Sequence, residues 1–128
     1  MHKVDILGVN IDAFTQVDVL KMIESYSGRQ IITANPEIVL EAWQNEKYLK
    51  LINESGLVLP DGIGLLWAAK FLSLKSEHIL SSVIQMMVTG ASLLIYPDYV
   101  KDVLPQRITG VDLMEKICEL ASQKNWKI

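Results

Sequence analysis

The sequence has little cysteine, few aromatic residues and no excess of positive charge. One cysteine among 128 residues excludes an internal disulfide, which fits a reducing compartment. The net charge of −3 gives no basic field of the kind that attracts nucleic acid. The charged N-terminus is not followed by a long apolar segment, so no signal peptide is indicated. These absences favour a cytoplasmic protein and exclude nucleic acid from its expected partners.

The motifs of several common active sites are missing as well. The chain has neither the glycine-rich fingerprint of dinucleotide-binding folds nor the lysine loop of P-loop proteins. It has no nucleophile elbow around a serine. His2 and His78 stand far apart, and no cysteine or histidine pair has the spacing of a zinc site. We therefore expect neither a cofactor nor a dedicated metal site.

The residues that are present describe one globular domain of the α/β class. Half of them are hydrophobic and 21% are charged. Short apolar runs that predict strands alternate with segments of helical periodicity. The expected strands cover 4–9, 10–14, 30–35 and 57–60, and the second of them alternates polar and apolar residues like an edge strand. The expected helices cover 16–27, 36–55 and 62–72, and Thr15 and Asn35 are expected to cap the first two. This alternation predicts a Rossmann-like parallel sheet with helices on both faces.

The second half of the chain is harder to interpret. Residues 79–96 form an uncharged run of 18 residues, near the lower limit for a membrane span. Polar residues dilute the run, so we favour a helix that Ser76 caps and Gly90 ends, followed by a strand over 91–96. A membrane span and a surface that rests on a membrane are the alternatives. The helix expected after residue 112 has an apolar stripe of Met114, Ile117, Cys118 and Ala121, with Leu113 and Leu120 also expected inward. A strand is expected to begin at Trp126.

One carboxylate stands out because of its position at a strand end. Asp61 follows the apolar run 57–60 and precedes Gly62, and ligands of α/β folds collect beyond the carboxyl ends of strands. Thr33 and Asn35 end the preceding strand, and Arg107 opens the turn Arg107-Ile108-Thr109-Gly110 at the start of the last helix. In a parallel sheet these side chains can share one crevice. Such a set suits a polyhydroxylated substrate with a phosphate leaving group.

Two of these residues also have purely structural explanations. One explanation of Asp61 is that it does no more than cap the helix that follows it, because a carboxylate accepts hydrogen bonds from free backbone N–H groups. Arg107 can be a solvated surface charge, as most arginines are. The residues alone leave both explanations open.

Three segments of the chain carry a specific pattern. They read Ile32-Thr33-Ala34-Asn35-Pro36-Glu37-Ile38-Val39, Leu57-Val58-Leu59-Pro60-Asp61-Gly62-Ile63-Gly64 and Arg107-Ile108-Thr109-Gly110-Val111-Asp112-Leu113. Together they resemble the three successive signature blocks of the WecG/TagA/CpsF glycosyltransferase family. The opening Ile6-Leu7-Gly8-Val9 with Ile11-Asp12 is similar to the start of that family. The resemblance covers residues 3–72 and 107–128.

The resemblance implies a UDP-sugar-dependent glycosyltransferase. Members of the family move an N-acetylmannosamine-type sugar from a UDP donor to a polyprenyl-diphosphate-linked sugar, with inversion and without a required metal. They work at the inner face of the cell membrane in teichoic acid, enterobacterial common antigen and exopolysaccharide synthesis. The family's proposed general base falls on Asp61, with Gly62 in the same block. Its substrate-binding threonine, asparagine and arginine fall on Thr33, Asn35 and Arg107.

The chain departs from the family pattern in two places. The 34 residues 73–106 replace a much shorter connection, and the chain ends where the family continues into a second half. We therefore expect a single domain over 1–128, equivalent to the N-terminal part of the family fold, in which 73–106 is an atypical, dispensable insertion. The alternative to an enzyme is a catalytically silent interaction module. Such a module would pair with a separately encoded half, or with itself as a homo-oligomer.

Overall fold

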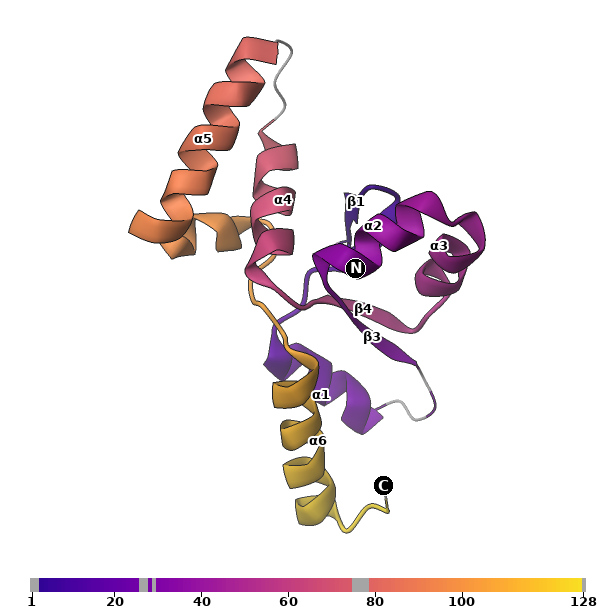
Figure 1. Ribbon diagram of the computed structural model, residues 1–128. Helices are drawn as coiled ribbons and strands as arrows, with labels where there is room; N and C mark the ends of the chain where they lie inside the picture. The colour runs from indigo at the N-terminus through magenta and orange to yellow at the C-terminus, as the bar shows by residue number, and fades with distance from the viewer. Residues whose placement is uncertain (1–2, 26–27, 29, 75–78, 128) are drawn as a thin grey trace.

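The computed structural model describes residues 3–25, 28, 30–74 and 79–127 (Figure 1). An antiparallel hairpin joins β1 (Lys3–Ile6) to β2 (Val9–Asp12), and a parallel pair joins β3 (Ile31–Ala34) to β4 (Leu57–Pro60). The helices are α1 (Gln16–Ser25), α2 (Pro36–Gln44), α3 (Glu46–Asn53), α4 (Ile63–Ser73), α5 (Ile79–Ile95) and α6 (Gly110–Lys124), with a 3₁₀ helix η1 (Pro97–Asp102). The predicted α/β class is confirmed.

The strand β4 lies between two hydrophobic clusters, because successive residues of a strand point to opposite faces. Val58 packs with the hairpin, α2, α3 and α4. Leu57 and Leu59 pack on the other face with Val19 of α1 and Leu113 of α6. Figure 1 shows α2 and α3 on one side of the parallel pair and α1 and α6 on the other. Helices therefore cover both faces of this small parallel sheet, as predicted.

Asp12 connects the hairpin to the parallel pair. Its carboxylate is fully buried, and its Oδ2 accepts a hydrogen bond of 2.9 Å from the backbone N of Val58. Its Oδ1 accepts no hydrogen bond within the described residues, but Lys3 Nζ lies 3.4 Å away. A buried charge is costly unless it is paired. These two contacts therefore fix the position of the hairpin against β4.

The helix predicted over 36–55 is in fact two helices. Asn45 ends α2 with an extended backbone, and its side chain then caps the start of α3 by accepting a hydrogen bond from the N of Tyr48 at 3.2 Å. Asparagine is among the best N-caps, so one residue suffices to restart the chain in a new direction. The caps predicted from the sequence at Thr15 and Asn35 are confirmed.

The strand predicted over 91–96 is wrong, because α5 continues as a helix through Gly90 to Ile95. A glycine in a helix costs about 1 kcal/mol relative to alanine, which packing can offset. Here α5 packs along α4, where Trp67 Nε1 donates a hydrogen bond of 3.0 Å to Oγ1 of the buried Thr89. The predicted cap Ser76 lies outside the described residues. None of the described helices is long and apolar enough to cross a membrane.

The C-terminal end of the segment 73–106 belongs to the protein core. Val100 of η1 and Leu104 are fully buried in the same hydrophobic cluster as Val58. The ammonium of Lys70 in α4 lies 2.7 Å from Oδ2 of Asp102. The burial of these last residues speaks against our expectation that the whole segment is dispensable, because removing them would leave a cavity in this cluster.

The side of α6 that faces away from α1 is more open than predicted. Leu113 and Ala121 are buried as expected, but Cys118 is exposed and Met114 is 60% exposed. Neither of these two residues is therefore core filler. Asn125 ends α6 in the left-handed conformation with φ 55°, and residues 126–127 are irregular. The strand expected from Trp126 is absent from the described residues.

Candidate functional site

The first two signature blocks meet at the carboxyl edge of the parallel pair. The register pairs Ala34 with Pro60, so Asn35 and Asp61 leave the sheet as neighbours. The backbone N of Asp61 donates a hydrogen bond of 2.7 Å to the carbonyl of Ala34, which extends the ladder by one residue. The sheet thus places the candidate base directly beside the Thr-Ala-Asn-Pro block.

The third block is held against the end of β4. The backbone N of Ile108 donates to the carbonyl of Pro60 at 2.8 Å, and the buried Ile108 side chain packs with Leu59. Two residues earlier, Gln106 Oε1 accepts a hydrogen bond of 2.9 Å from the N of Gln16 at the start of α1. The segment is therefore fixed on both sides, and it delivers the N-terminus of α6 to the strand end.

Asp61 bonds to the start of α6 and does not cap the helix that follows it. Its side chain is partly buried, and its Oδ2 accepts a hydrogen bond of 3.3 Å from the N of Gly110. The N-terminal residue of α4 is preceded by Gly62, which offers no side-chain cap. The alternative in which Asp61 serves as the cap of α4 is thereby wrong. Free N–H groups at a helix N-terminus attract negative charge, so the start of α6 is a favourable neighbour for the Asp61 carboxylate.

Thr33 closes this arrangement from the other side. A Cβ added at Gly110 would lie 3.0 Å from Thr33 Oγ1, a tight contact that would require the Thr33 hydroxyl to shift slightly. Because position 110 is a glycine, the Thr33 hydroxyl and the Asp61 carboxylate can both lie close to the backbone at the start of α6. We call Thr33, Asp61 and Gly110 the site cluster.

Gly62 and Asn35 lie next to the site cluster, just beyond the ends of β4 and β3. Gly62 has φ 133° and ψ 141°, a conformation that only glycine adopts without strain. A Cβ added at Gly64 would lie 3.1 Å from Pro36 Cγ, so the turn after β4 packs tightly on the start of α2. Asn35 uses its Oδ1 to cap α2 by accepting a hydrogen bond of 2.9 Å from the N of Ile38. Its amide nitrogen forms no hydrogen bond with any residue that the structure describes.

Arg107 is the predicted site residue that the structure does not join to the others. Its side chain is exposed, and it forms no ion pair with any residue of the described part of the chain. Its neighbour Ile108 is nevertheless bonded to Pro60, so the backbone of Arg107 lies at the rim of the strand end. The guanidinium is thus available to an anionic group from outside the chain.

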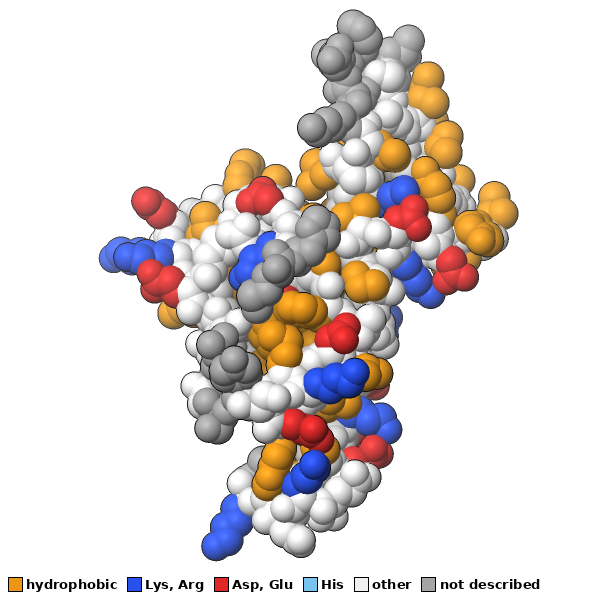
Figure 2. Space-filling view, turned by 180° about the vertical axis from the view of Figure 1, so that it is seen from behind, with side chains coloured by type: hydrophobic (Ala, Val, Ile, Leu, Met, Phe, Trp, Pro, Cys, Tyr) orange, Lys and Arg blue, Asp and Glu red, His pale blue; other side chains and the backbone are white. Residues whose placement is uncertain are grey.

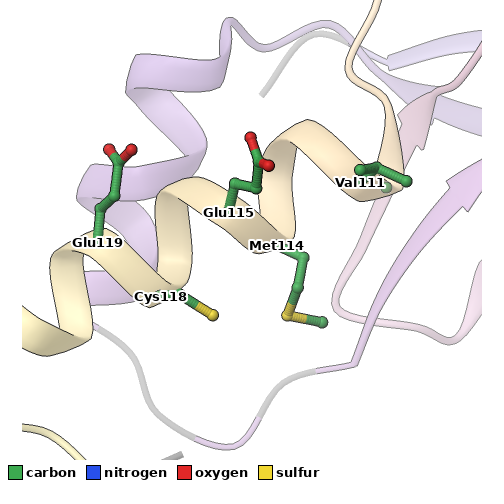
Figure 3. Close-up of a pocket in the computed structure, with 6 residues that line it drawn as sticks. Val111, Met114, Glu115, Cys118 and Glu119 are labelled. Carbon is green, nitrogen blue, oxygen red and sulfur yellow. The ribbon is translucent and has the colours of Figure 1, made fainter.

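A surface pocket of about 630 Å³ begins at Gly110 and follows α6 (Figure 3). Its other lining residues are Val111, Met114, Glu115, Cys118 and Glu119. In Figure 3 Met114 and Cys118 point to one side of the helix, and the two glutamates point away from them. The pocket and the site cluster share only Gly110. Over the described ranges, no three histidine, cysteine or acidic side chains gather where they could hold a metal ion.

Two residues with clear structural roles had no assigned role in the sequence analysis. Gly110 was grouped with a helix start, although a glycine in a first helical turn already points to a close approach of another group. Asp12 was assigned to an alternating edge strand, where a polar residue normally faces solvent. Its burial has no signal in the local sequence, because it depends on the backbone of β4, 46 residues further along the chain.

Comparisons with known proteins support the resemblance in the signature blocks. The family described as Glycosyl transferase WecG/TagA/CpsF family matches residues 4–87. Relatives named N-acetylglucosaminyldiphosphoundecaprenol N-acetyl-beta-D-mannosaminyltransferase occur in Staphylococcus aureus strains NCTC 8325 / PS 47, COL and MRSA252. Each is 30% identical over 132 residues, which cover 98% of this chain and 41% of the relative. Since the family match includes well over half of the residues, the chain belongs to the WecG/TagA/CpsF glycosyltransferase family.

Proposed function

We propose that this chain carries the catalytic base of an inverting transferase that moves an N-acetylmannosamine-type sugar from a UDP donor to a polyprenyl-diphosphate-linked sugar. The relatives are named as N-acetylmannosaminyltransferases of N-acetylglucosaminyldiphosphoundecaprenol, which supports the sugar and the acceptor. The family resemblance supports the UDP donor, the inversion and a place in teichoic acid or exopolysaccharide synthesis. The chain spans 41% of these relatives, so the proposal concerns a part of the whole enzyme.

The observation that carries the proposal is the meeting of Thr33, Asp61 and Gly110 at the carboxyl edge of β3 and β4. This edge is where α/β folds bind their ligands. A partly buried carboxylate there can accept a proton from a substrate hydroxyl, while the neighbouring threonine hydroxyl can orient the substrate. The three residues come from three separate signature blocks, and the fold brings them together.

The proposed reaction is a single displacement. Asp61 removes the proton of the acceptor hydroxyl while the hydroxyl oxygen attacks the anomeric carbon of the UDP-sugar. The bond from that carbon to the UDP oxygen breaks, and its electron pair leaves with the diphosphate. Attack opposite the leaving group inverts the configuration. Arg107, with the helix N-termini at this edge, would stabilise the negative charge that develops on the diphosphate.

The remaining predicted residues bind substrate in this proposal. Thr33 and the amide nitrogen of Asn35 would form hydrogen bonds with sugar hydroxyls, and the glycine at position 62 would let the substrate approach the backbone closely. The acceptor is anchored by its lipid, so the enzyme would work as a peripheral protein at the inner face of the cell membrane. Neither a metal nor a cofactor takes part in the proposed step.

A second candidate function is an interaction module without activity, which pairs with a separately encoded half. The two candidates differ in a direct assay of the chain, alone and mixed with the remaining part of the S. aureus relative. Transfer in either assay supports the enzyme, whereas complex formation without transfer supports the module.

The exchange Asp61→Asn tests the proposed base. Asparagine keeps the shape of the side chain and an oxygen for the N–H of Gly110, but it cannot take up a proton at neutral pH. We expect the transfer rate to fall by roughly 10²- to 10⁴-fold, the usual contribution of a positioned general base. The assay supplies the UDP-sugar and the lipid-diphosphate acceptor, and the melting temperature is recorded for each variant.

Asp112→Asn is the matched control. Asp112 is also near the start of α6, but it is exposed and lies outside the site cluster. It should retain the parental rate. If Asp61→Asn transferred sugar at the parental rate while melting several degrees lower, Asp61 would be a structural residue and not the base.

A further inference from the structure

The helix α5 has its polar residues on the inside and its apolar residues on the outside. From position 81 to 95 every exposed residue is apolar, and these are Val83, Ile84, Met86, Met87, Val88, Ala91, Leu94 and Ile95. The polar residues of the same stretch, Ser81, Ser82, Gln85, Thr89 and Ser92, are partly or fully buried. A surface helix in water normally shows the opposite distribution.

The inner face of α5 is stabilised by hydrogen bonds. Thr89 is fully buried, and its Oγ1 accepts from Trp67 Nε1 of α4 at 3.0 Å and donates to the carbonyl of Gln85 at 2.7 Å. Ser92 Oγ donates to the carbonyl of Thr89 at 2.7 Å. Since the polar residues are used in this way, the inverted pattern is a property of the packing between α4 and α5.

The outer face of α5 is extensive and strongly exposed. Leu94 is 90%, Ile95 82% and Met87 66% exposed, and together with the other exposed residues they extend from Val83 to Ile95. Figure 1 shows α4 and α5 side by side, projecting from the rest of the molecule, and Figure 2 shows hydrophobic side chains along this projection. Single exposed apolar residues are normal, but a continuous patch of this kind marks an interaction surface.

The distribution of charge indicates what this surface contacts. No charged residue occurs over 79–97, whereas Lys75 and Glu77 precede this stretch and Asp98 and Lys101 follow it. Such an uncharged stretch suits contact with the apolar part of a bilayer leaflet when the helix lies in the interface plane. Protein interfaces are enriched in aromatic residues, arginine and methionine and have a polar rim, whereas over 81–95 the exposed residues of α5 include methionine but no aromatic or charged residue.

We propose that the outer face of α5 is a lipid-facing surface, which lies at the boundary between headgroups and acyl chains of a membrane leaflet. The choice of lipid over protein rests in part on the proposed function, whose acceptor is held in a membrane. The net charge of −3 opposes attraction to anionic lipids. Binding must therefore come from burial of apolar area, and it should not depend on salt.

Vesicle sedimentation with the full chain tests this proposal. One set of vesicles consists of phosphatidylcholine, and a second set also contains phosphatidylglycerol. Neither set contains sugar-lipid or donor, so the result is independent of sugar transfer and can fail while the transferase proposal stands. We expect the protein to pellet with both sets, at low and at high salt alike.

The double variant Met87→Glu/Leu94→Glu places two charges on the outer face of α5. Both positions are exposed, so the fold should be kept, as melting curves can verify. We expect the partition into vesicles to fall by about tenfold or more, because a charged side chain is costly in the acyl region. The control Leu40→Glu/Leu51→Glu puts the same charges on exposed leucines of α2 and α3, and it should bind as the parent does.

The oligomeric state of parent and variants is measured in parallel by sedimentation velocity. The proposal is overturned if the parent fails to pellet, or if it pellets only with phosphatidylglycerol at low salt. It is overturned as well if the double variant on α5 still binds vesicles. A parental dimer that Met87→Glu/Leu94→Glu dissociates, with no vesicle binding, would assign the surface to a second copy of the chain.

Discussion

Gly110 contributes to the site cluster in two ways, because its missing side chain leaves room for Thr33 and its backbone N–H faces Asp61. A glycine at the start of a helix is usually replaceable by alanine with a gain in stability, since alanine restricts the unfolded chain. Here the added methyl group would lie 3.0 Å from Thr33 Oγ1. The benefit of alanine and the steric conflict with threonine therefore oppose each other at this position.

We expect the conflict to appear as coupling in a double-mutant cycle. Gly110→Ala alone should change the free energy of unfolding little or unfavourably, because the methyl group displaces the Thr33 hydroxyl. Thr33→Ala removes that hydroxyl, so Gly110→Ala in this background should be better tolerated by about 1 kcal/mol. Urea denaturation of the four proteins measures this difference. Additive effects would mean that Thr33 moves aside freely and that the contact does not define the site.

At the scale of helices and strands, the helix caps that depend on nearby residues were predictable, whereas the effect of packing between distant helices was not. Thr15 and Asn35 were identified as caps because a cap depends on residues three positions away, which a sequence window contains. Asn45 has the same chemistry but stands inside a helical pattern, and it was missed. The end of α5 was misjudged because Gly90 lowers helix propensity locally, whereas the packing of α5 on α4 is a long-range effect.

The cap at the start of α1 should make the stability of the protein sensitive to acid. The Thr15 hydroxyl donates a hydrogen bond to the Asp18 carboxylate at 2.6 Å, and the Thr15 backbone N donates a second at 3.1 Å. These bonds lower the pKa of Asp18 below its ordinary value of 3.8. A lowered pKa in the folded state stabilises the fold above the unfolded value, and that contribution is lost as the pH falls through the folded value.

Asp18→Asn should therefore melt at a lower temperature than the parent at neutral pH, and the difference should shrink when the pH falls below 3.8. Melting curves followed by circular dichroism over a pH series measure this change. Glu41→Gln, on the exposed side of α2, serves as a control that should track the parent at every pH. A difference for Asp18→Asn that stays constant into acid would show that the ionised carboxylate contributes nothing to the cap.

At the scale of the whole molecule, the segment 73–106 belongs to two environments. Its outer helix α5 exposes apolar residues, whereas Val100 and Leu104 complete the core around Val58. The sequence analysis treated the segment as one insertion, because an uncharged run gives no sign of which of its flanks is buried. The convergence of Thr33, Asn35 and Asp61 on one sheet edge was predictable from strand order, but the position of the Arg107 side chain was not.

Two leucines of this segment should respond in opposite ways to truncation. Leu104→Ala removes a fully buried side chain and should lower the free energy of unfolding by about 2–5 kcal/mol. Leu94→Ala removes a side chain that is 90% exposed and should change it by less than about 0.5 kcal/mol. Urea denaturation of both variants measures these changes. Equal effects would contradict the division of the segment into a core part and a surface part.

The hydrogen bond from Gly110 to Asp61 joins residues 49 positions apart, which has a consequence for biosynthesis. The entropy of closing such a loop grows only by about 0.6 kcal/mol for each doubling of its length, so a lengthened connection between α4 and α6 adds little to the cost. The longer connection has a larger effect on the time between synthesis of Asp61 and synthesis of Gly110 on the ribosome. Asp61 leaves the exit tunnel well before Gly110, and the nascent chain carries an exposed carboxylate until α6 has been made. Asp61, the proposed base, therefore acquires its hydrogen bond to Gly110 only when α6 docks, after β4 has already been translated.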